Sequence, residues 1–429
     1  MGSLGIAEER PARRSDGIRI RRWLTPATLA ITIALFGVLL VDGLITVHSD
    51  YQGLIDLLVY RAGGQAVLSG HSLYAADFAA VNHAPNGLSF TYPPFAAVVF
   101  APLALLTTGV AKVVMVVVNV AAAITLFAIV AVGTQGKWER LRSRQALTAP
   151  ISVRTAVAIV AAAAVFVYSI PVQHNMIYGQ VNLVLAAAVA LDLLLPSTPW
   201  PRGLLVGIAF AVKLTPAVFV GYFLVTRQWR AMAVSLASAV LASAIGWLVA
   251  PSDTVRYWTS TAFDPARIGG LAYASNQSMR GVIERIPALD GLSGVIWVVA
   301  AVLVVGLAIV AIEVSRRRGD PVAGMLSAAY IGLLCSPVSW GHHWVWLSAT
   351  SVYFLMRWAA VGGVRNLAAG LVVAIVTRAA PWAHLPNSDQ RERQWTPVQH
   401  LLGSTWALTA LVLLSLFALG WPTQPSRRT

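Results

Sequence analysis

The stretch VAKVVMVVVNVAAAITLFAIVAVG at residues 110–133 contains a single charged residue, Lys112. An α-helix needs about 20 predominantly apolar residues to cross a bilayer, and this stretch is long enough to do so. Other apolar stretches follow the same pattern and lie near residues 24–47, 155–171, 180–196, 231–250, 295–312, 321–336, 344–358, 364–380 and 401–421. The sequence therefore predicts an all-α polytopic membrane protein.

The composition of the whole chain supports a membrane protein. Hydrophobic residues make up 57% of the 429 positions and charged residues only 11%, against roughly 25% charged in a soluble domain. The mean hydropathy of +0.70 extends over nearly the whole length, which excludes a soluble enzyme carrying one anchor. The single cysteine, Cys335, cannot form an internal disulfide.

Two further stretches are short or interrupted. Residues 93–108 contain Pro102, and residues 203–226 contain Lys213 and Pro216 near their middle. The second stretch could be one span or a hairpin of two half-helices. With both stretches included, we expect about twelve transmembrane helices.

Basic residues exceed acidic ones by 14 and lie in short loops between apolar stretches, so we interpret them as determinants of membrane orientation and partners of anionic lipid headgroups. Nucleic acid is not an expected partner. The loops expected on the cytoplasmic side contain Arg10, Arg13, Arg14, Arg19, Arg21 and Arg22, then Arg227 and Arg230, Arg316 to Arg318, Arg357 and Arg365, and Arg427 and Arg428. Because successive loops of a polytopic protein alternate between the two sides of the membrane, we expect the loops 48–92, 251–293, 337–343 and 381–399 on the outer side.

One loop is in conflict with strict alternation. It contains Lys137, Arg140, Arg142, Arg144 and Arg154. Its positive charge predicts the cytoplasmic side, whereas the number of membrane crossings before it, with 93–108 counted as one, predicts the outer side. We follow the charge, which makes 93–108 re-entrant and 203–226 a hairpin. We expect one membrane domain at 24–421, a basic cytoplasmic segment at 1–23 and a cytoplasmic tail at 422–429.

Polar residues gather in the expected outer loops, and the first such loop contains Asp50, Asp56, Arg61, His71, Tyr74, Asp77 and Tyr92. Most of its acids are best explained as solvated carboxylates. Asp56 differs because apolar residues flank it on both sides, which predicts a partly buried position on an amphipathic helix, on one face with Tyr60 and Gly63. Burial would raise its pKa and a salt bridge to Arg61 would lower it, and carboxyl groups perturbed in this way are enriched at active sites.

A second cluster occurs in SIPVQHNMIYGQVN, residues 169–182. Its polar residues are Gln173, His174, Asn175, Tyr178, Gln180 and Asn182. They are compatible with an interfacial turn whose ends are capped by amides. They are equally compatible with a sugar-binding site, because each sugar hydroxyl needs a hydrogen-bond donor and an acceptor. Lys213 is a third element. A lysine in mid-span costs about 2.5–3.5 kcal/mol on insertion scales, so we expect a buried anion or a carboxylate partner for it, and Lys213 is a candidate for binding phosphate.

The segment SPVSWGHHWVW, residues 336–346, carries adjacent histidines at an expected outer helix end. Neighbouring positions on a helix point about 100° apart, so His342 and His343 form a poor metal chelate, and hydrogen bonding or proton transfer by one of them is the preferred interpretation. In the outer loop, Asn276, Gln277 and Ser278 form a glycosylation sequon, a weak signal, and Arg280 is a second candidate for contact with a phosphate.

The sequence contains no nucleotide-binding GxxxxGK[ST] motif, no GxSxG nucleophile motif and no Cys/His zinc spacing. It therefore gives no support for a soluble nucleotide-sugar donor, for a metal or for another cofactor.

These clusters, in this order, resemble glycosyltransferase family 87 of the GT-C superfamily, the polyprenol-phosphate-mannose-dependent α-1,2-mannosyltransferases of mycobacteria and their relatives. The similar pieces extend over about residues 50–345; they are DLLVYRAGG with Asp56, SGHSLYAADF with Gly70 and Tyr74, TYPPF at 91–95, GQVN at 179–182, AFAVKLTP at 209–216, NQS at 276–278 and SPVSWGHH at 336–343. Each motif alone is weak, whereas the ordered set is fairly specific for the family.

The resemblance implies a GT-C fold, a mannosyl lipid-phosphate donor, a mannosylated glycolipid acceptor such as a phosphatidylinositol mannoside or lipomannan, and an active site in periplasmic loops at the plasma membrane. It assigns Asp56 as general base and one histidine, His342 or His343, as a further catalytic residue. The residues expected to contact the donor phosphate or sugar are Lys213, Arg61, Arg280, Tyr92, Gln180, Asn182, Asn276 and Gln277.

The expected mechanism is a single displacement in which Asp56 takes the proton of the acceptor 2-hydroxyl and a β-linked donor gives an α product. Three alternatives stay open at this stage. Related enzymes transfer arabinofuranose from a similar lipid donor, about twelve spans also suit a lipid-linked-sugar transporter or flippase, and a scaffold without catalytic activity would leave the polar clusters unrelated to one another.

Overall fold

The computed structural model describes residues 23–24, 37, 53–135 and 151–422. The expected first span at 24–47, the segment 1–23 and the tail 422–429 lie outside the described residues apart from their edges. The described part is helical except for one antiparallel pair of two-residue strands, β1 (Trp23–Leu24) and β2 (Ile151–Ser152).

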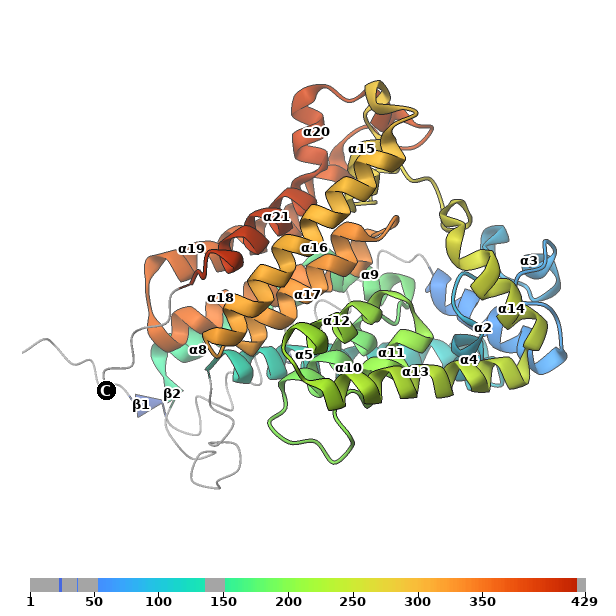
Figure 1. Ribbon diagram of the computed structural model, residues 1–429, viewed down its shortest axis with the longest axis horizontal. Helices are drawn as coiled ribbons and strands as arrows, with labels where there is room; N and C mark the ends of the chain where they lie inside the picture. Colours follow the sequence, from blue (N-terminus) through green and yellow to red (C-terminus); the bar gives the residue numbers. More distant parts are fainter. Residues whose placement is uncertain (1–22, 25–36, 38–52, 136–150, 423–429) are drawn as a thin grey trace, which may run out of the picture.

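Apolar stretches and short polar connections produce a bundle of helices of very different lengths. The α-helices are α2 (Ile55–Ser69), α3 (Phe78–Val81), α4 (Pro94–Ala104), α5 (Thr108–Gln135), α8 (Val153–Tyr168), α9 (Ile170–Tyr178), α10 (Asn182–Leu194), α11 (Leu204–Val212), α12 (Val218–Val225), α13 (Trp229–Val249), α14 (Pro251–Thr259), α15 (Met279–Glu284), α16 (Ser293–Arg317), α17 (Pro321–Cys335), α18 (Val345–Val361), α19 (Val364–Ala379), α20 (Pro397–Gly403) and α21 (Thr405–Ala418). Short 3₁₀ turns join them, among them η2 (Thr215–Ala217) and η6 (Gly341–His343). Figure 1 shows α2, α3 and α14 together at one end and the strand pair at the other.

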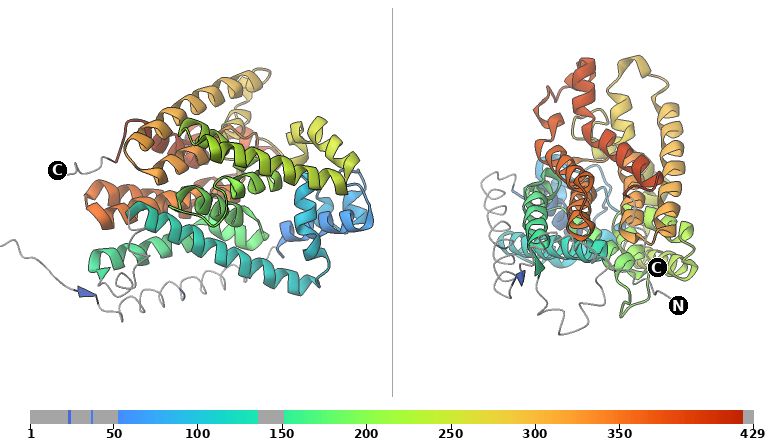
Figure 2. Two further views of the ribbon diagram at one scale, coloured as in Figure 1. Left: turned by 60° about the horizontal axis from the view of Figure 1, so that its bottom comes forward. Right: turned by 90° about the vertical axis from the view of Figure 1, so that its left-hand side faces the viewer.

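Within the described residues, four segments are long and apolar enough to cross a membrane: α5, α13, α16 and the segment that begins with α19. The number rises to six if two bent pairs each count as one span, namely α8 with α9, bent by 49°, and α20 with α21, bent by 65°. Five shorter apolar stretches of 10–17 residues accompany them. The chain is therefore an all-helical membrane protein, and about twelve spans stays a prediction. Figure 2 shows the longer helices running side by side.

Several basic helix ends gather on one side of the bundle, which we call the basic side. Arg154 at the start of α8 donates to the carbonyl of Ala359 near the end of α18 (3.0 Å). Arg318, after α16, donates to the carbonyl of Gly420 beyond α21. Arg357 pairs with Asp320 before α17 (3.2 Å). The ends of three helices (α16, α18 and α21) and the starts of two (α8 and α17) thus lie together, as expected if basic turns share one face of a membrane.

The stretch 203–226 forms the hairpin that was expected once the basic loop 137–154 was assigned by its charge. A β-carbon placed on Gly203 would lie 2.1 Å from the carbonyl oxygen of Ala231, so the start of α11 lies beside the start of α13. Residues 226–228 alone separate α12 from α13. Both ends of the hairpin therefore lie together. Lys213 occupies the break between α11 and α12, where the backbone is extended.

The buried residues form two apolar cores. The larger includes Phe166, Trp344 and Phe354 in the middle of the bundle, and the smaller lies beneath α2 and α4. Helices α2 and α4 pack closely because α2 presents small residues: a β-carbon on Gly64 would lie 2.8 Å from both Cα of Ala101 and the carbonyl oxygen of Phe100. This close contact fixes the position of α2, which carries Asp56.

We expect Gly64→Ala to destabilise the protein by about 1–3 kcal/mol, the usual cost of overpacking, because its β-carbon meets rigid backbone of α4. Thermal unfolding of the purified protein in detergent measures the loss as a lower Tm. Gly221→Ala is the matched control, since nothing lies within 4 Å of a β-carbon there. An unchanged Tm for Gly64→Ala would contradict the packing described for α2 and α4.

Candidate active site

The site is built around the turn Gly179–Asn182, between α9 and α10. Gly179 has φ of 68°, and a β-carbon on it would lie 2.9 Å from Cβ of Leu57. Glycine therefore permits both the left-handed backbone and the close approach of this turn to α2. This close approach brings the next residue, Gln180, within hydrogen-bonding distance of α2: its Nε2 donates to Oδ2 of Asp56 at 2.6 Å.

Two tyrosines hold the other end of the Gln180 amide. The Tyr60 hydroxyl donates to Oε1 of Gln180 at 2.9 Å, and the Tyr92 hydroxyl donates to the same atom at 3.3 Å. The two hydroxyls also lie 2.9 Å apart. Both phenols are buried, so these bonds fix which way the amide points. The nitrogen of Gln180 is thereby turned toward the carboxylate.

Asn182, two residues after Gln180, forms the next link of the network. Its Nδ2 lies 3.3 Å from Oε1 of Gln180, and its Oδ1 accepts from Nζ of Lys213 at 2.7 Å. Lys213 in turn lies 3.2 Å from Nε2 of His343. The ammonium of Lys213 also lies 5.3 Å from the ring centroid of Tyr92. One hydrogen-bonded path therefore runs from Asp56 through two amides to Lys213 and His343.

Both ends of this path keep capacity for a substrate. An ammonium has three donors, and Lys213 uses two of them on Asn182 and His343. In the described part of the chain, Oδ2 is the one Asp56 oxygen with a hydrogen-bond donor. A hydroxyl could donate to its Oδ1, and an anion could accept from Lys213.

The carboxyl of Asp56 lies on α2, outside the candidate membrane spans. Burial raises the pKa of Asp56 to about 6; the hydrogen bond from Gln180 and the charge of Lys213 lower it but do not cancel the effect of burial. A carboxyl with a pKa near 6 is ionised at neutral pH and is a stronger base than an ordinary aspartate, which suits general base catalysis.

The two histidines have different surroundings. The backbone carbonyl of His342 accepts from the amides of Asn175 (2.7 Å) and Asn182 (3.2 Å), while its ring packs against Tyr178 with centroids 5.8 Å apart. The His343 ring reaches Lys213. Burial, and then the Lys213 charge, lower the pKa of His343 well below its usual value, so its ring is neutral. If Lys213 donates to Nε2, the proton of His343 is on Nδ1.

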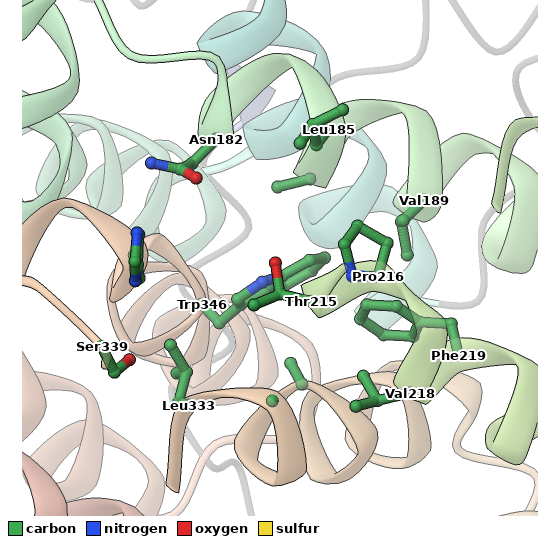
Figure 3. A pocket seen from close by; sticks show the side chains of 14 residues that line it. Asn182, Leu185, Val189, Thr215, Pro216, Val218, Phe219, Leu333, Ser339 and Trp346 are labelled. Atoms are coloured by element: carbon green, nitrogen blue, oxygen red, sulfur yellow. The ribbon is translucent and has the colours of Figure 1, made fainter. Parts of the chain in front are cut away.

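Behind the path lies a cavity of about 40 Å³ (Figure 3). Asn182 and Ser339 lie toward one side of it, and Val189 and Phe219 toward the other. The Ser339 hydroxyl and Nδ1 of His343 are buried without a hydrogen-bond partner among the described residues. Most of the lining is apolar, but Asn182, Thr215, Ser339 and His343 give the cavity polar groups, and a cavity of this size with such partners can hold an ordered water that would satisfy both groups.

Two arginines expected at the site have other partners. Arg61 donates to the carbonyls of Leu103 (3.0 Å) and Leu106 (2.7 Å) and to the hydroxyl of Thr108 (2.6 Å). It therefore caps the C-terminal end of α4, and its bonds hold α2 against the α4–α5 turn. Arg280 pairs with Glu284 at 2.6 Å and lies over the Trp297 ring.

Asn276 and Gln277 shape the backbone beside the site. Asn276 is fully buried; its Nδ2 donates to the carbonyl of Pro337 at 3.1 Å, and its Oδ1 accepts from the amide of Ser339 at 2.9 Å. Gln277 donates to the carbonyl of Gly403 at 2.7 Å. These bonds fix the 337–339 segment, which leads directly into η6 and the histidines.

Two residues of the network were not among the expected site residues. Tyr60 lies one helical turn after Asp56, and that spacing was the available signal. Asn175 is fully buried and lies in the expected polar cluster, but no sequence feature distinguishes its role. In the described residues, no group of three or more His, Cys, Asp or Glu could hold a metal ion.

Residues 90–337, more than half of the chain, match the model of glycosyltransferase family 87. The chain belongs to glycosyltransferase family 87. The matched range contains four members of the path, Tyr92, Gln180, Asn182 and Lys213, whereas Asp56 and the histidines lie outside it.

Curated relatives extend the similarity of this family 87 chain over most of its length. A polyprenol-phosphate-mannose-dependent α-(1-2)-phosphatidylinositol mannoside mannosyltransferase of Mycobacterium tuberculosis is 36% identical over 86% of each chain. A protein of the same description from Mycolicibacterium smegmatis is also 36% identical, over 90% of this chain and 88% of the relative. A phosphatidylinositol pentamannoside mannosyltransferase of M. smegmatis is 34% identical over 86% and 84%. No solved structure matches the chain.

The raised pKa of Asp56 predicts a pH-dependent effect on stability. Its folded pKa lies above the unfolded one, so ionisation costs folding free energy, and that cost develops as the pH rises from about 4 through about 6. We expect Asp56→Asn to raise the Tm above that of the wild type at pH 7.5, with a gain on the order of 2 kcal/mol, and to have little effect at pH 4.5. The same Tm difference at both pH values would contradict the burial of this carboxyl.

Proposed function

We propose that the protein transfers mannose from polyprenyl-phosphate-mannose to the 2-hydroxyl of a mannosylated phosphatidylinositol glycolipid and forms an α-1,2 linkage. The printed activities of its curated relatives support this donor and this acceptor class. The observation that carries the proposal is the hydrogen-bonded path from Asp56 to Lys213 and His343. A carboxylate at one end of this network and an ammonium at the other support the roles of base and cation.

This separation suits an inverting displacement. The attacking oxygen and the departing phosphate oxygen lie on opposite faces of the reacting carbon, so a base for the first and a cation for the second belong on opposite sides of the sugar. Asp56, as general base, accepts the proton of the acceptor hydroxyl while that oxygen bonds to the anomeric carbon. The bond from the anomeric carbon to the phosphate oxygen breaks, and the lipid phosphate leaves with that electron pair.

The leaving phosphate carries the charge that the site has to stabilise. Lys213 offers its third N–H to a phosphate oxygen, and His343 holds the ammonium in place from the other side. A positioned cation in a partly buried site stabilises developing negative charge far better than one in water. Of the two histidines, we therefore assign the chemical role to His343, and we assign His342 a structural role through its carbonyl and ring.

The arrangement of the helix ends supports a periplasmic active site. Arg154, Arg318 and Arg357 lie on the basic side, where α18 ends, whereas His343 lies just before the start of α18. Asp56 belongs to the same network as His343 through Gln180, Asn182 and Lys213. If positive charge marks the cytoplasmic face, the site faces the periplasm. We propose accordingly a GT-C architecture in the plasma membrane, with about twelve crossings once the shorter apolar helices and the chain outside the described residues are included.

The direct test is transfer of radiolabelled mannose from polyprenyl-phosphate-mannose to phosphatidylinositol mannosides by the purified protein. We expect α-1,2-linked label from the wild type and a loss of about 10²–10⁴-fold in Asp56→Asn, the usual contribution of a general base. Asp77→Asn is the matched control, because Asp77 lies in the same outer region and is exposed. Wild-type turnover by Asp56→Asn would remove Asp56 from the mechanism; absence of transfer by folded wild type would reject the donor or the acceptor.

The pH dependence of the reaction provides a second test. Protonated Asp56 cannot accept the hydroxyl proton, so we expect kcat/KM to fall about tenfold per pH unit as the pH decreases below the Asp56 pKa of about 6. Initial rates between pH 5 and pH 8, at low donor concentration, measure the profile. A rate independent of pH across this range, in protein that stays folded, would contradict the assignment of the base.

A further inference from the structure

A second cavity lies on the face of α2 that points away from Asp56. It measures about 310 Å³, within the usual range of about 300–1,000 Å³ for ligand sites. Successive helix positions are about 100° apart, so its lining residues Arg61, Gln65 and Ser69 lie on the opposite side of α2 from Asp56. Residues of α3, of the turn after α3 and of the end of α4 complete its walls. This cavity, which we call the back pocket, is therefore separate from the hydrogen-bonded path.

The lining of the back pocket suits an anion. Arg61 brings a guanidinium, and its hydrogen bonds to the end of α4 and the start of α5 use three of its five N–H groups. The imidazoles of His71 and His83 and the amide of Gln65 add further hydrogen-bonding groups. None of the described residues that line the pocket is acidic. An anion bound there would meet a positive charge and several donors, with no carboxylate to oppose it.

Asn82, another lining residue, favours a ligand that also carries a hydroxyl group. The residue is 5% exposed, and its Nδ2 donates to the carbonyl of Phe78 at 3.0 Å. Its Oδ1 is buried without a hydrogen-bond partner among the described residues, and such an acceptor is costly to leave unpaired. The next residue, His83, has φ of 55°, a left-handed conformation that is uncommon outside glycine and that gathers at ligand sites.

The back pocket lies at one end of a membrane-spanning helix. Arg61 donates to the hydroxyl of Thr108, the first residue of α5, at 2.6 Å, and α5 is long and apolar enough to cross a membrane. Figure 1 places α2 and α3 at the end of the molecule away from β2, which directly precedes α8 and the basic side. Next to the pocket, Leu105 is 76% exposed and Val113 is 64% exposed. Polar lining and lipid-facing surface therefore meet there.

These features favour a phospholipid over a soluble anion. A soluble phosphate would use the guanidinium and the donors but not the apolar surface beside them. A phospholipid uses both, because its phosphodiester binds Arg61 while its acyl chains lie along Leu105 and Val113. A hydroxyl on the headgroup can donate to Oδ1 of Asn82. The chemical class that fits is an anionic phospholipid with a hydroxylated headgroup, such as phosphatidylglycerol.

We propose that the back pocket binds the headgroup of an anionic, hydroxylated phospholipid of the surrounding bilayer, at a site distinct from the catalytic one. Arg61 couples this lipid to the fold, because the same guanidinium holds α2 against α4 and α5. The bound lipid thus stabilises the helix that carries Asp56. A ligand that binds only the folded state raises the Tm, so the inference is testable whichever sugar and acceptor the protein uses.

The test adds lipid to the purified protein in neutral detergent and measures the Tm. We expect phosphatidylglycerol, but not phosphatidylcholine, to raise the Tm of the wild type. Gln65→Glu places a carboxylate at an exposed lining position with little change of shape, so we expect its apparent affinity for phosphatidylglycerol to fall at least about tenfold through repulsion of like charges. Asn86→Asp is the matched control, the same exchange at an exposed position outside the pocket, and should keep the wild-type affinity.

The outcomes separate the pocket from the lipid. Equal affinities of Gln65→Glu and Asn86→Asp for phosphatidylglycerol would show that the pocket assignment is wrong. If soluble glycerol phosphate raises the Tm as much as phosphatidylglycerol at the same concentration, the ligand is a soluble anion and the lipid assignment fails. Phosphatidic acid has no headgroup hydroxyl, so we expect it to bind more weakly than phosphatidylglycerol; equal binding would remove the role of Asn82.

Crosslinking of the wild type with a photoactivatable phosphatidylglycerol tests the location without any variant. Label on α2 or α3 that excess phosphatidylglycerol displaces and excess phosphatidylcholine does not supports the back pocket. Displaceable label confined to α10, α11 or α12, which surround Lys213, would place the lipid at the catalytic site and overturn the proposal.

Discussion

The rest of the site depends on the turn Gly179–Asn182, which brings a carboxylate and an ammonium into one network without direct contact between them. Gly179 allows the backbone of the turn to approach Leu57, and the two amides that follow connect Asp56 to Lys213. Direct pairing of the two charges would neutralise both and leave neither free for a substrate. The amide bridge keeps them apart while it satisfies the buried donors and acceptors that an apolar bundle cannot leave unpaired.

A second set of buried polar groups, in the segment between α14 and α16, holds the chain that leads to η6. Arg285 is fully buried and donates to the carbonyls of Ala272 and Tyr273 (3.0 and 3.1 Å), while its guanidinium lies over the Trp395 ring. Through Asn276 the same loop holds the segment before η6. The position of His343 is therefore determined by residues that touch no part of the proposed substrates.

The sequence alone was sufficient to predict the class of fold and most of the residues of the path. Three features stood out in an apolar chain: a lysine within an apolar stretch, an aspartate flanked by apolar residues, and the polar turn GQVN. Each costs free energy in apolar surroundings unless it binds a partner or has a function. It could not place Arg61 or Arg280, since the partner of a guanidinium is set by contacts across the fold. Arg61 binds Thr108, 47 positions away. Helix lengths followed the sequence only in part: Lys213 does interrupt the stretch 203–226 between α11 and α12, whereas Pro102 lies inside α4 and does not divide it.

The hairpin with Lys213 at its tip has a consequence for biosynthesis. The lysine emerges from the ribosome 130 residues before His343, its partner at 3.2 Å, and after Asn182, its partner at 2.7 Å. Until residue 343 has been synthesised, Asn182 is the only one of these two partners that the chain already contains. Contacts between such distant positions form late. A nascent chain that stops before residue 343 thus contains Asp56, the two bridging amides and Lys213 but lacks the imidazole that Lys213 contacts in the folded protein.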